Sequence, residues 1–205
     1  VGHEDVLIVI SAMGKTTNAL EVVIKNYFEK SNEFNASLQE VRKYHNQILL
    51  ELFDDEEHDV YFAVNSHFAD LEYFLRSNKS PNYNFVYDLV ISYGEIVSTT
   101  IVSHYFNEKG LKNNWIDVRN LIKTDATYRD ANVDWDKTQK NISKIAKKKQ
   151  LFVTQGFVGS DENGFTTTLG REGSDYTAAI FAYCLNVESV TIWKDVPGVM
   201  NADPR

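Results

Sequence analysis

The run Val6-Leu7-Ile8-Val9-Ile10 is the clearest strand signal in this chain. Consecutive apolar residues, most of them β-branched, are typical of a strand that is buried on both faces of a parallel sheet. A polar turn over residues 11–18 follows this run and leads into helical apolar spacing from Leu20 to Phe28. Strand, turn and helix in that order form the repeating unit of α/β proteins.

The same alternation continues along the rest of the chain. Helices are predicted at residues 38–52, 60–75, 85–106 (with Gly110 as C-terminal cap), 134–149 (with Asp134 as N-cap) and 174–185. Further strands are predicted at residues 115–118, 151–154 and 190–193. The chain has only 3 Pro and 10 Gly, with no repeat and no linker, so we expect one domain over residues 1–205. The predicted fold is a three-layer α/β/α sandwich with a mainly parallel sheet, incomplete at both ends because the sequence lacks an initial Met and stops directly after a Pro.

Composition excludes several classes of function. The 205 residues carry 21 basic and 29 acidic side chains, a net charge of −8, which disfavours a nucleic acid partner. No apolar run approaches the roughly 18–20 residues of a membrane span, and no signal peptide is evident, so no membrane partner is expected. The single cysteine, Cys184, excludes an internal disulfide and fits a reducing, cytoplasmic compartment. The 5 His residues lack metal-ligand spacing.

Polar segments follow three of the predicted strands, where ligands of open α/β sheets gather. They are residues 11–18, 155–175 and 194–205. The densest part, residues 166–175, leads into a helix that Ser174 or Asp175 can cap, with backbone N–H groups facing the loop. Gly170 and Gly173 would let a ligand approach the backbone, and Arg171 suits a carboxylate or phosphate. The alternative is an ordinary capped loop with a surface arginine; neither a Walker A nor a G-x-G-x-x-G motif occurs.

Two carboxylates outside this loop are further candidates. Glu95 follows Gly94 inside an apolar helical stretch, where a glycine costs roughly 1 kcal/mol relative to alanine. Close approach of a ligand to that face, with Glu95 accepting from an ammonium group, would explain the glycine; a solvent-facing carboxylate is the alternative. Asp195 precedes a Pro-Gly pair just past a predicted strand, where it serves a ligand or simply forms the turn.

Five stretches together resemble the catalytic domain of aspartokinases, within the amino acid kinase family. They are residues 9–14 with Thr17-Asn18, Ser92-Tyr93-Gly94-Glu95, residues 152–157, residues 166–175 and residues 193–205. Their order and spacing agree with the family over the whole chain. The run Thr-Thr-Thr-Leu-Gly-Arg-x-Gly-Ser-Asp is highly specific, and S-x-G-E lies at the right distance upstream of it.

The resemblance implies transfer of the γ-phosphoryl group of Mg-ATP to the β-carboxylate of L-aspartate, giving 4-phospho-L-aspartate on the route to lysine, threonine and methionine. It implies that Mg²⁺ is bound mainly through the nucleotide phosphates, with no direct protein ligand, and that the parent protein is a homo-oligomer. Phosphoryl transfer depends chiefly on positioning and charge stabilisation. The implied site residues are Glu95 for the substrate ammonium, Arg171 for its α-carboxylate, Thr17, Gly173 and Ser174 for the rest of the aspartate pocket, Ser11 and Asp175 near the transferring group, and Lys194, Asp195 and Arg205 for the nucleotide.

The sequence also departs from the family pattern. The Lys-Phe-Gly-Gly-Thr-Ser strand with which such domains begin has no counterpart, and a second phosphate-contacting lysine would fall after Arg205. Lys194 stands where many members have Thr, and Glu172 where many have Gly. We therefore expect the parent protein, and not this chain alone, to phosphorylate aspartate. Two alternatives stay open: another carboxylate or carbamate kinase of the same fold, and an amino-acid-binding module without catalysis.

Overall fold

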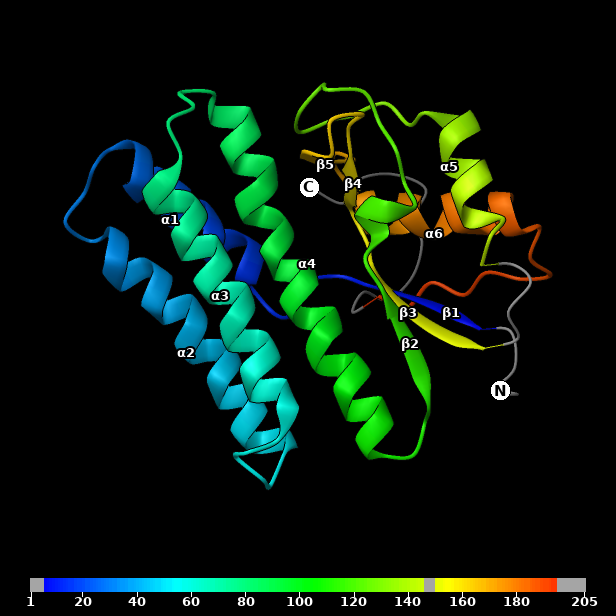
Figure 1. The fold of residues 1–205 in the computed structure, drawn as a ribbon, viewed down its shortest axis with the longest axis horizontal. Coiled ribbons are helices and arrows are strands. Elements are labelled where there is room, and N and C mark those ends of the chain that lie inside the picture. Colours follow the sequence, from blue (N-terminus) through cyan, green and yellow to red (C-terminus); the bar gives the residue numbers. More distant parts are fainter. Residues whose placement is uncertain (1–5, 146–149, 195–205) are drawn as a thin grey trace.

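A three-stranded parallel sheet lies at the centre of the protein, for which a computed structural model describes residues 6–145 and 150–194 (Figure 1). Its strands lie in the order β1 (Leu7–Ile10), β3 (Leu151–Gln155) and β2 (Asn113–Ile116). Leu7 pairs with Phe152 and Trp115 with Val153, in parallel register. Every residue of β3 is buried, because β3 has a strand on each side and helices above and below it. The predicted parallel sheet is confirmed.

Four helices between β1 and β2 form a stack beside this sheet (Figure 1). They are α1 (Thr16–Phe28), α2 (Phe34–Leu52), α3 (Asp59–Ser77) and α4 (Tyr83–Glu108). Side chains cap two of them: His58 accepts a hydrogen bond from the N–H of Val60, and Asn82 from that of Phe85. Their apolar stripes face one another and bury a core that includes Leu20, Leu49, Val64, Leu71, Ile91 and Ile101.

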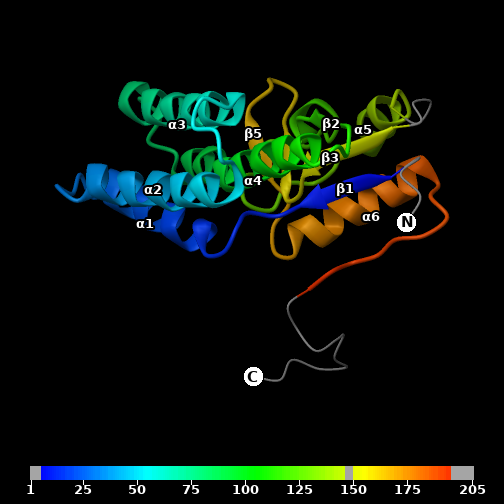
Figure 2. The ribbon, with the colours of Figure 1, turned by 90° about the horizontal axis from the view of Figure 1, so that it is seen from below.

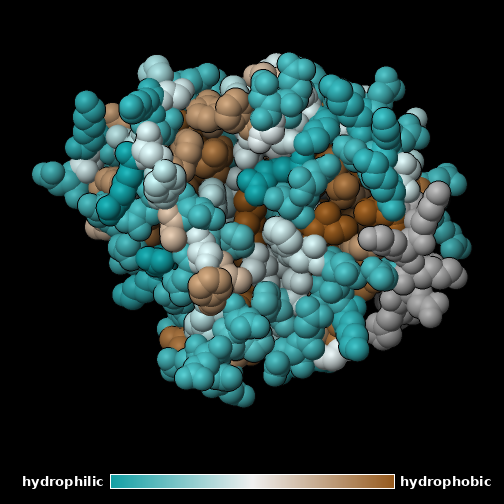
Figure 3. Space-filling model, in the orientation of Figure 1, coloured by the Kyte–Doolittle hydropathy of each residue, from teal (hydrophilic) through white to brown (hydrophobic). Residues whose placement is uncertain are grey.

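The long helix α4 joins the helical stack to the sheet. It packs against α1 and α3 on one side and against β2 and β3 on the other. Contrary to the expectation from the sequence, α4 is long and apolar enough to cross a membrane by length and composition, but 78% of its most apolar 18-residue stretch is buried inside the protein. It is therefore a core helix, and the face of the molecule seen in Figure 3 is predominantly hydrophilic.

Helices cover the other face of the sheet as well, which confirms the three-layer arrangement. In Figure 2, β1 lies between α4 and α6 (Gly173–Leu185). A second core joins the apolar side chains Leu7 and Val9 of β1 to Ile180 and Phe181 of α6. The remaining elements around it are the 3-10 turn η1 (Val118–Asn120), α5 (Trp135–Ile142), and a hairpin of β4 (Val158–Ser160) and β5 (Thr166–Thr168).

Three predictions about these elements are wrong. Residues 190–193 form no strand, and Val190, Ile192 and Trp193 are 50%, 52% and 90% exposed. A short apolar run needs a neighbouring strand edge, and no described strand pairs with this one. The capping of α5 by Asp134 is confirmed, but α5 ends at Ile142. The N–H groups of Lys144 and Ile145, just past that end, make i→i−3 hydrogen bonds instead of continuing the α-helical pattern. Residues 146–149 lie outside the described residues. The antiparallel hairpin falls in a segment for which the sequence predicts only a polar loop.

Candidate active site

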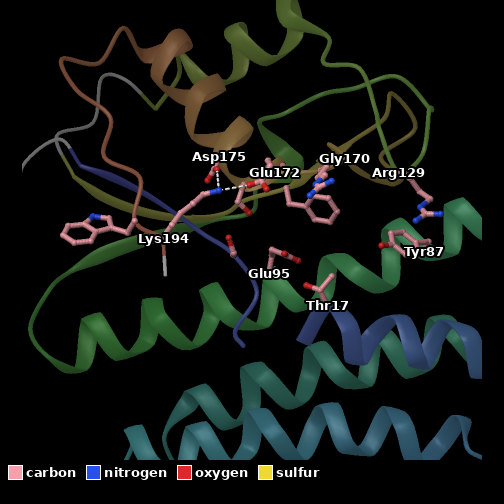
Figure 4. Close-up of a pocket in the computed structure, with 14 residues that line it drawn as sticks. Thr17, Tyr87, Glu95, Arg129, Gly170, Glu172, Asp175 and Lys194 are labelled. Atoms are coloured by element: carbon pink, nitrogen blue, oxygen red, sulfur yellow. Dashed lines mark hydrogen bonds and ion pairs between the residues drawn. The ribbon is translucent and has the colours of Figure 1, made fainter. Parts of the chain in front are cut away.

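A cavity of about 820 Å³ opens where α1, α4 and the N-terminus of α6 meet (Figure 4). Residues far apart in the sequence line it together. Those that the sequence singles out are Ser11, Thr17, Glu95, Arg171, Gly173, Ser174, Asp175 and Lys194. The other two predicted site residues, Asp195 and Arg205, lie outside the described residues. The structure thus brings the candidates from four separate segments to one place, while their individual roles stay predictions.

Glu95 is the most unusual charged group in this cavity. Its side chain extends from α4 toward the opening (Figure 4), yet the residue is only 4% exposed. The N–H of Ala12 donates to Oε1 at 3.4 Å, and Oε2 has no partner among residues 6–145 and 150–194. Burial raises the pKa of this carboxyl from 4.5 to about 8. A buried carboxylate that lacks a cation fits an ammonium ligand, and the alternative of a solvent-facing Glu95 is wrong.

Gly94 allows close packing of protein segments, whereas the expectation from the sequence was close approach of a ligand. A Cβ at this position would lie 3.0 Å from the Cβ of Ala12 and 3.5 Å from Cγ2 of Thr16. The missing side chain therefore allows α1 and the loop before it to pack closely on α4. The expectation that Gly94 makes room for a ligand is wrong, although the close packing does bring Ala12 to Glu95.

The entry into α6 also differs from the prediction. Glu172 occupies the N-cap position in the left-handed conformation, with φ +57°, and no side chain caps the helix. Ser174 and Asp175 lie within the first turn, so the prediction that one of them is the cap is wrong. The first-turn N–H groups and the positive end of the helix dipole at the cavity suit an anion.

The missing side chains of Gly170 and Gly173 make room for neighbouring protein atoms, while both residues also line the cavity. A Cβ at Gly170, where φ is +76°, would meet the carboxylate of Asp130. A Cβ at Gly173 would lie 3.1 Å from Cα of Phe157. Both glycines thus allow neighbouring loops to pack against the segment that carries Arg171.

An ion-pair cluster lies at one end of the cavity (Figure 4). Nζ of Lys194 is 2.7 Å from Oε2 of Glu172 and 2.6 Å from Oδ2 of Asp175. The two carboxylates raise the pKa of Lys194, and Lys194 lowers that of Glu172. Lys194 and Glu172 are two of the positions where the sequence departs from the family pattern, and their direct contact shows that the two departures are compatible. All three groups stay partly exposed, so the pairing is screened by solvent.

Tyr87 and Arg129 line the other end of the cavity, and neither of them was predicted from the sequence. The guanidinium of Arg129 lies 4.2 Å above the ring of Tyr87, and both residues line the cavity (Figure 4). The hydroxyl of Tyr87 donates to Glu21 at 2.8 Å, and burial, with that hydrogen bond, raises the pKa of Tyr87 to about 12. No pattern in the sequence around Arg129 indicates a role at a site. Asp88, next to Tyr87, could have been noticed, because it is an acidic residue inside an apolar helical stretch, and it is buried.

Metal ligands are not grouped in the described parts of the chain. Over residues 6–145 and 150–194, no three His, Cys, Asp or Glu side chains are arranged to hold a metal ion.

A family of phosphotransferases accounts for this fold and this cavity. The chain belongs to the amino acid kinase family, whose sequence model matches residues 2–205. Within it, the chain is related to aspartokinases: it is 38% identical over 128 residues to the lysine-sensitive aspartokinase 3 of Escherichia coli, covering 58% of this chain and 27% of that protein.

Solved aspartokinase structures share the fold. The structure of E. coli aspartokinase III in complex with lysine and aspartate has a TM-score of 0.84 and 29% identity, over 94% of this chain and 43% of that one. The same enzyme in complex with aspartate and ADP has a TM-score of 0.80, at the same identity and coverage. The chain therefore spans less than half of the solved aspartokinase chains and about a quarter of its curated relative.

Proposed function

We propose that the protein containing this chain is an aspartate kinase, which transfers the γ-phosphoryl group of ATP to the β-carboxylate of L-aspartate. The observation that carries the proposal is the buried carboxylate of Glu95, whose Oε2 has no partner, in a cavity that Arg171 also lines. An anion and a cation at one cavity match the two charged groups that every free amino acid carries. The aspartate named in both structures of E. coli aspartokinase III supports this assignment.

The amino-acid end of the cavity explains selectivity. In this proposal Glu95 accepts from the substrate ammonium, Arg171 binds its α-carboxylate, and Thr17, Gly173 and Ser174 complete the pocket. An analogue that lacks either charged end would leave a buried or confined charge without a partner, which is a strong basis for rejection. N-Acetylated amino acids should therefore bind poorly.

The nucleotide end lies at Lys194, beside the N-terminus of α6, whose residues Gly173 and Ser174 also border the amino-acid pocket. Lys194 and the first-turn N–H groups suit a polyphosphate, and Ser11 and Asp175 line the same cavity. The ADP in the relative supports nucleotide binding. Mg²⁺ would be bound mainly through the nucleotide phosphates, as in other phosphoryl-transfer sites. Rate enhancement then comes from holding the two substrates in line and from balancing charge.

A hydroxamate assay with ATP and aspartate tests the proposal. The full-length protein should form aspartyl hydroxamate, and should not accept glutamate or N-acetylglutamate at a comparable rate. Preference for either of the latter would indicate a different carboxylate kinase, and aspartate binding without turnover or nucleotide affinity would indicate a binding module. We expect the 205-residue chain alone to be at least roughly 10²-fold slower, the usual cost of losing a preorganised charge; robust turnover by the chain would contradict that expectation.

Aspartate binding should release a proton at neutral pH. The pKa of Glu95 is about 8 in the free protein, so the carboxyl is mostly protonated at pH 7. It must ionise to pair with the ammonium group, and up to about one proton leaves per aspartate bound. Calorimetry at pH 7 in two buffers of different ionisation enthalpy should give different binding enthalpies, and the difference should vanish at pH 9. Equal enthalpies at pH 7 would show that the ammonium does not meet Glu95.

A further inference from the structure

Asp88 is a buried carboxylate outside the residues discussed as ligands. It lies on α4, seven residues and about two turns before Glu95, so both side chains project from the same side of the helix. Asp88 is 0% exposed and has no cationic side chain bonded to it. It accepts instead from the N–H of Arg129 at 2.9 and 3.0 Å, and from the N–H and hydroxyl of Thr168 at 2.8 and 2.9 Å.

Through these hydrogen bonds Asp88 connects two loops. Each loop has an arginine that lines the cavity. Arg129 belongs to the loop between η1 and α5, and Thr168 ends β5 three residues before Arg171. The loops also contact each other directly, since the N–H of Ala131 donates to the carbonyl of Thr168 at 2.9 Å. A network in which every buried polar group is paired is rigid, and it loses most of that rigidity when one member is removed.

The backbone of Arg129 requires an anchor. Its φ of +72° is unfavourable for a residue other than glycine and costs of order 1 kcal/mol or more. Asp88 holds this conformation through the N–H of Arg129, and the side chain of the adjacent Tyr87 supports the guanidinium from below. The strained residue and its two supports thus present a cation at the cavity wall.

We propose that Asp88 is a positioning residue for the amino-acid pocket: it fixes the loops of Arg129 and Arg171 at a set distance from Glu95, and Arg129 acts with Arg171 on the carboxylate end of the substrate. This inference rests on the proposed function. Asp88 and Glu95 lie on the same helix. In this proposal α4 therefore sets the distance between the carboxylate of Glu95 and the guanidinium groups of Arg129 and Arg171. Arg129 lies at the end of the cavity away from Lys194 (Figure 4), which separates it from the nucleotide end.

Asp88→Asn in the full-length protein tests the inference. Asparagine keeps the volume but replaces one of the two acceptor oxygens with a donor, so it loses one of the two hydrogen bonds that Asp88 accepts from each loop. We expect the KM for aspartate to rise at least about 10-fold with the KM for ATP changed less than about 3-fold. The N–H groups of Arg129 and Thr168 should lose hydrogen-exchange protection. Arg129→Met should raise the aspartate KM while leaving the protection of Thr168 intact.

Ser103→Ala is the matched control. Ser103 is also buried on α4 and donates to Asn113 at 2.7 Å, so its loss breaks a tertiary hydrogen bond far from the cavity. It should lower stability without changing the aspartate KM. A folded Asp88→Asn variant with wild-type aspartate KM, or with unchanged exchange at both amides, would overturn the inference. If the wild-type protein fails to bind aspartate, the proposed function falls, and the exchange data alone still decide whether Asp88 holds the two loops.

Discussion

Glu95→Gln should lower aspartate affinity by roughly 10²–10³-fold, the usual effect of removing one partner of a buried charge pair. The residue is 4% exposed, and Oε2 has no partner in the part of the chain that the structure describes, so neither solvent nor a described protein group replaces the lost contact with the ammonium group. A neutral amide offers a single acceptor and adds donors that face the substrate's own positive charge. Calorimetric titration with aspartate measures the loss, and the affinity for ATP should change little.

The same substitution should remove a pH dependence of stability. Burial raises the pKa of Glu95 from 4.5 to about 8, so between these values the unfolded chain has lost its proton and the folded one has kept it. The free energy of unfolding of the wild type therefore falls as pH rises through this window and levels off above it, by up to about 5 kcal/mol for this shift. Glutamine does not titrate, so the fall should be absent from the variant.

Urea unfolding at pH 5 and pH 8.5 measures this difference. Glu172→Gln is the control for the pH dependence. It removes an exposed carboxylate from the same cavity, and the pKa of that carboxylate is lowered, not raised, because of Lys194. That variant should keep the wild-type loss of stability between the two pH values. A Glu95→Gln protein that binds aspartate normally would end the assignment of Glu95 to the ammonium group, whatever its stability.

Periodic apolar patterns predicted most of the fold, because burial dictates them locally. The helices α1 to α4 and the strand β3 each show a continuous pattern in the sequence, and all are present. The failures have a common cause. Residues 190–193 look like a strand, but whether such a short run pairs depends on a neighbouring edge that the run itself does not encode. The three-residue strands β4 and β5 are too short to show a period at all.

The candidate site was predictable where side chains have distinctive chemistry. Glu95 and the segment 170–175 could be found from residue type and spacing, and the structure brings them to one cavity. The environment of each group was not predictable. The space beside Gly94 was assigned to a ligand, and Ala12 and Thr16 occupy it instead. Asp88 and Arg129 meet only through the folded chain, 41 positions apart, and no local pattern announces such a pair.

Gly156 lies between the end of β3 and the first turn of α6, without room for a side chain. It follows β3, and its N–H donates to the carbonyl of Ile10 at 2.9 Å, which fixes it against β1. A Cβ on Gly156 would lie 2.8 Å from Cα of Ser174, a backbone atom that cannot rotate away. Because Ser174 is in the first turn of α6, a methyl group at Gly156 must displace that turn or the segment of Gly156 packed against it.

Gly156→Ala should therefore damage stability and binding together. We expect a loss of about 1–3 kcal/mol in the free energy of unfolding, typical of overpacking, and a fall of about 10²-fold in kcat/KM for aspartate, typical of a displacement near 1 Å. Gly164→Ala is the control: Gly164 lies at the hairpin tip with φ +82°, and a Cβ there would have no atom within 4 Å, so the substitution should cost backbone strain alone and leave kcat/KM unchanged. A Gly156→Ala protein with wild-type kcat/KM would contradict the assignment of the first turn of α6 to the wall of the aspartate pocket.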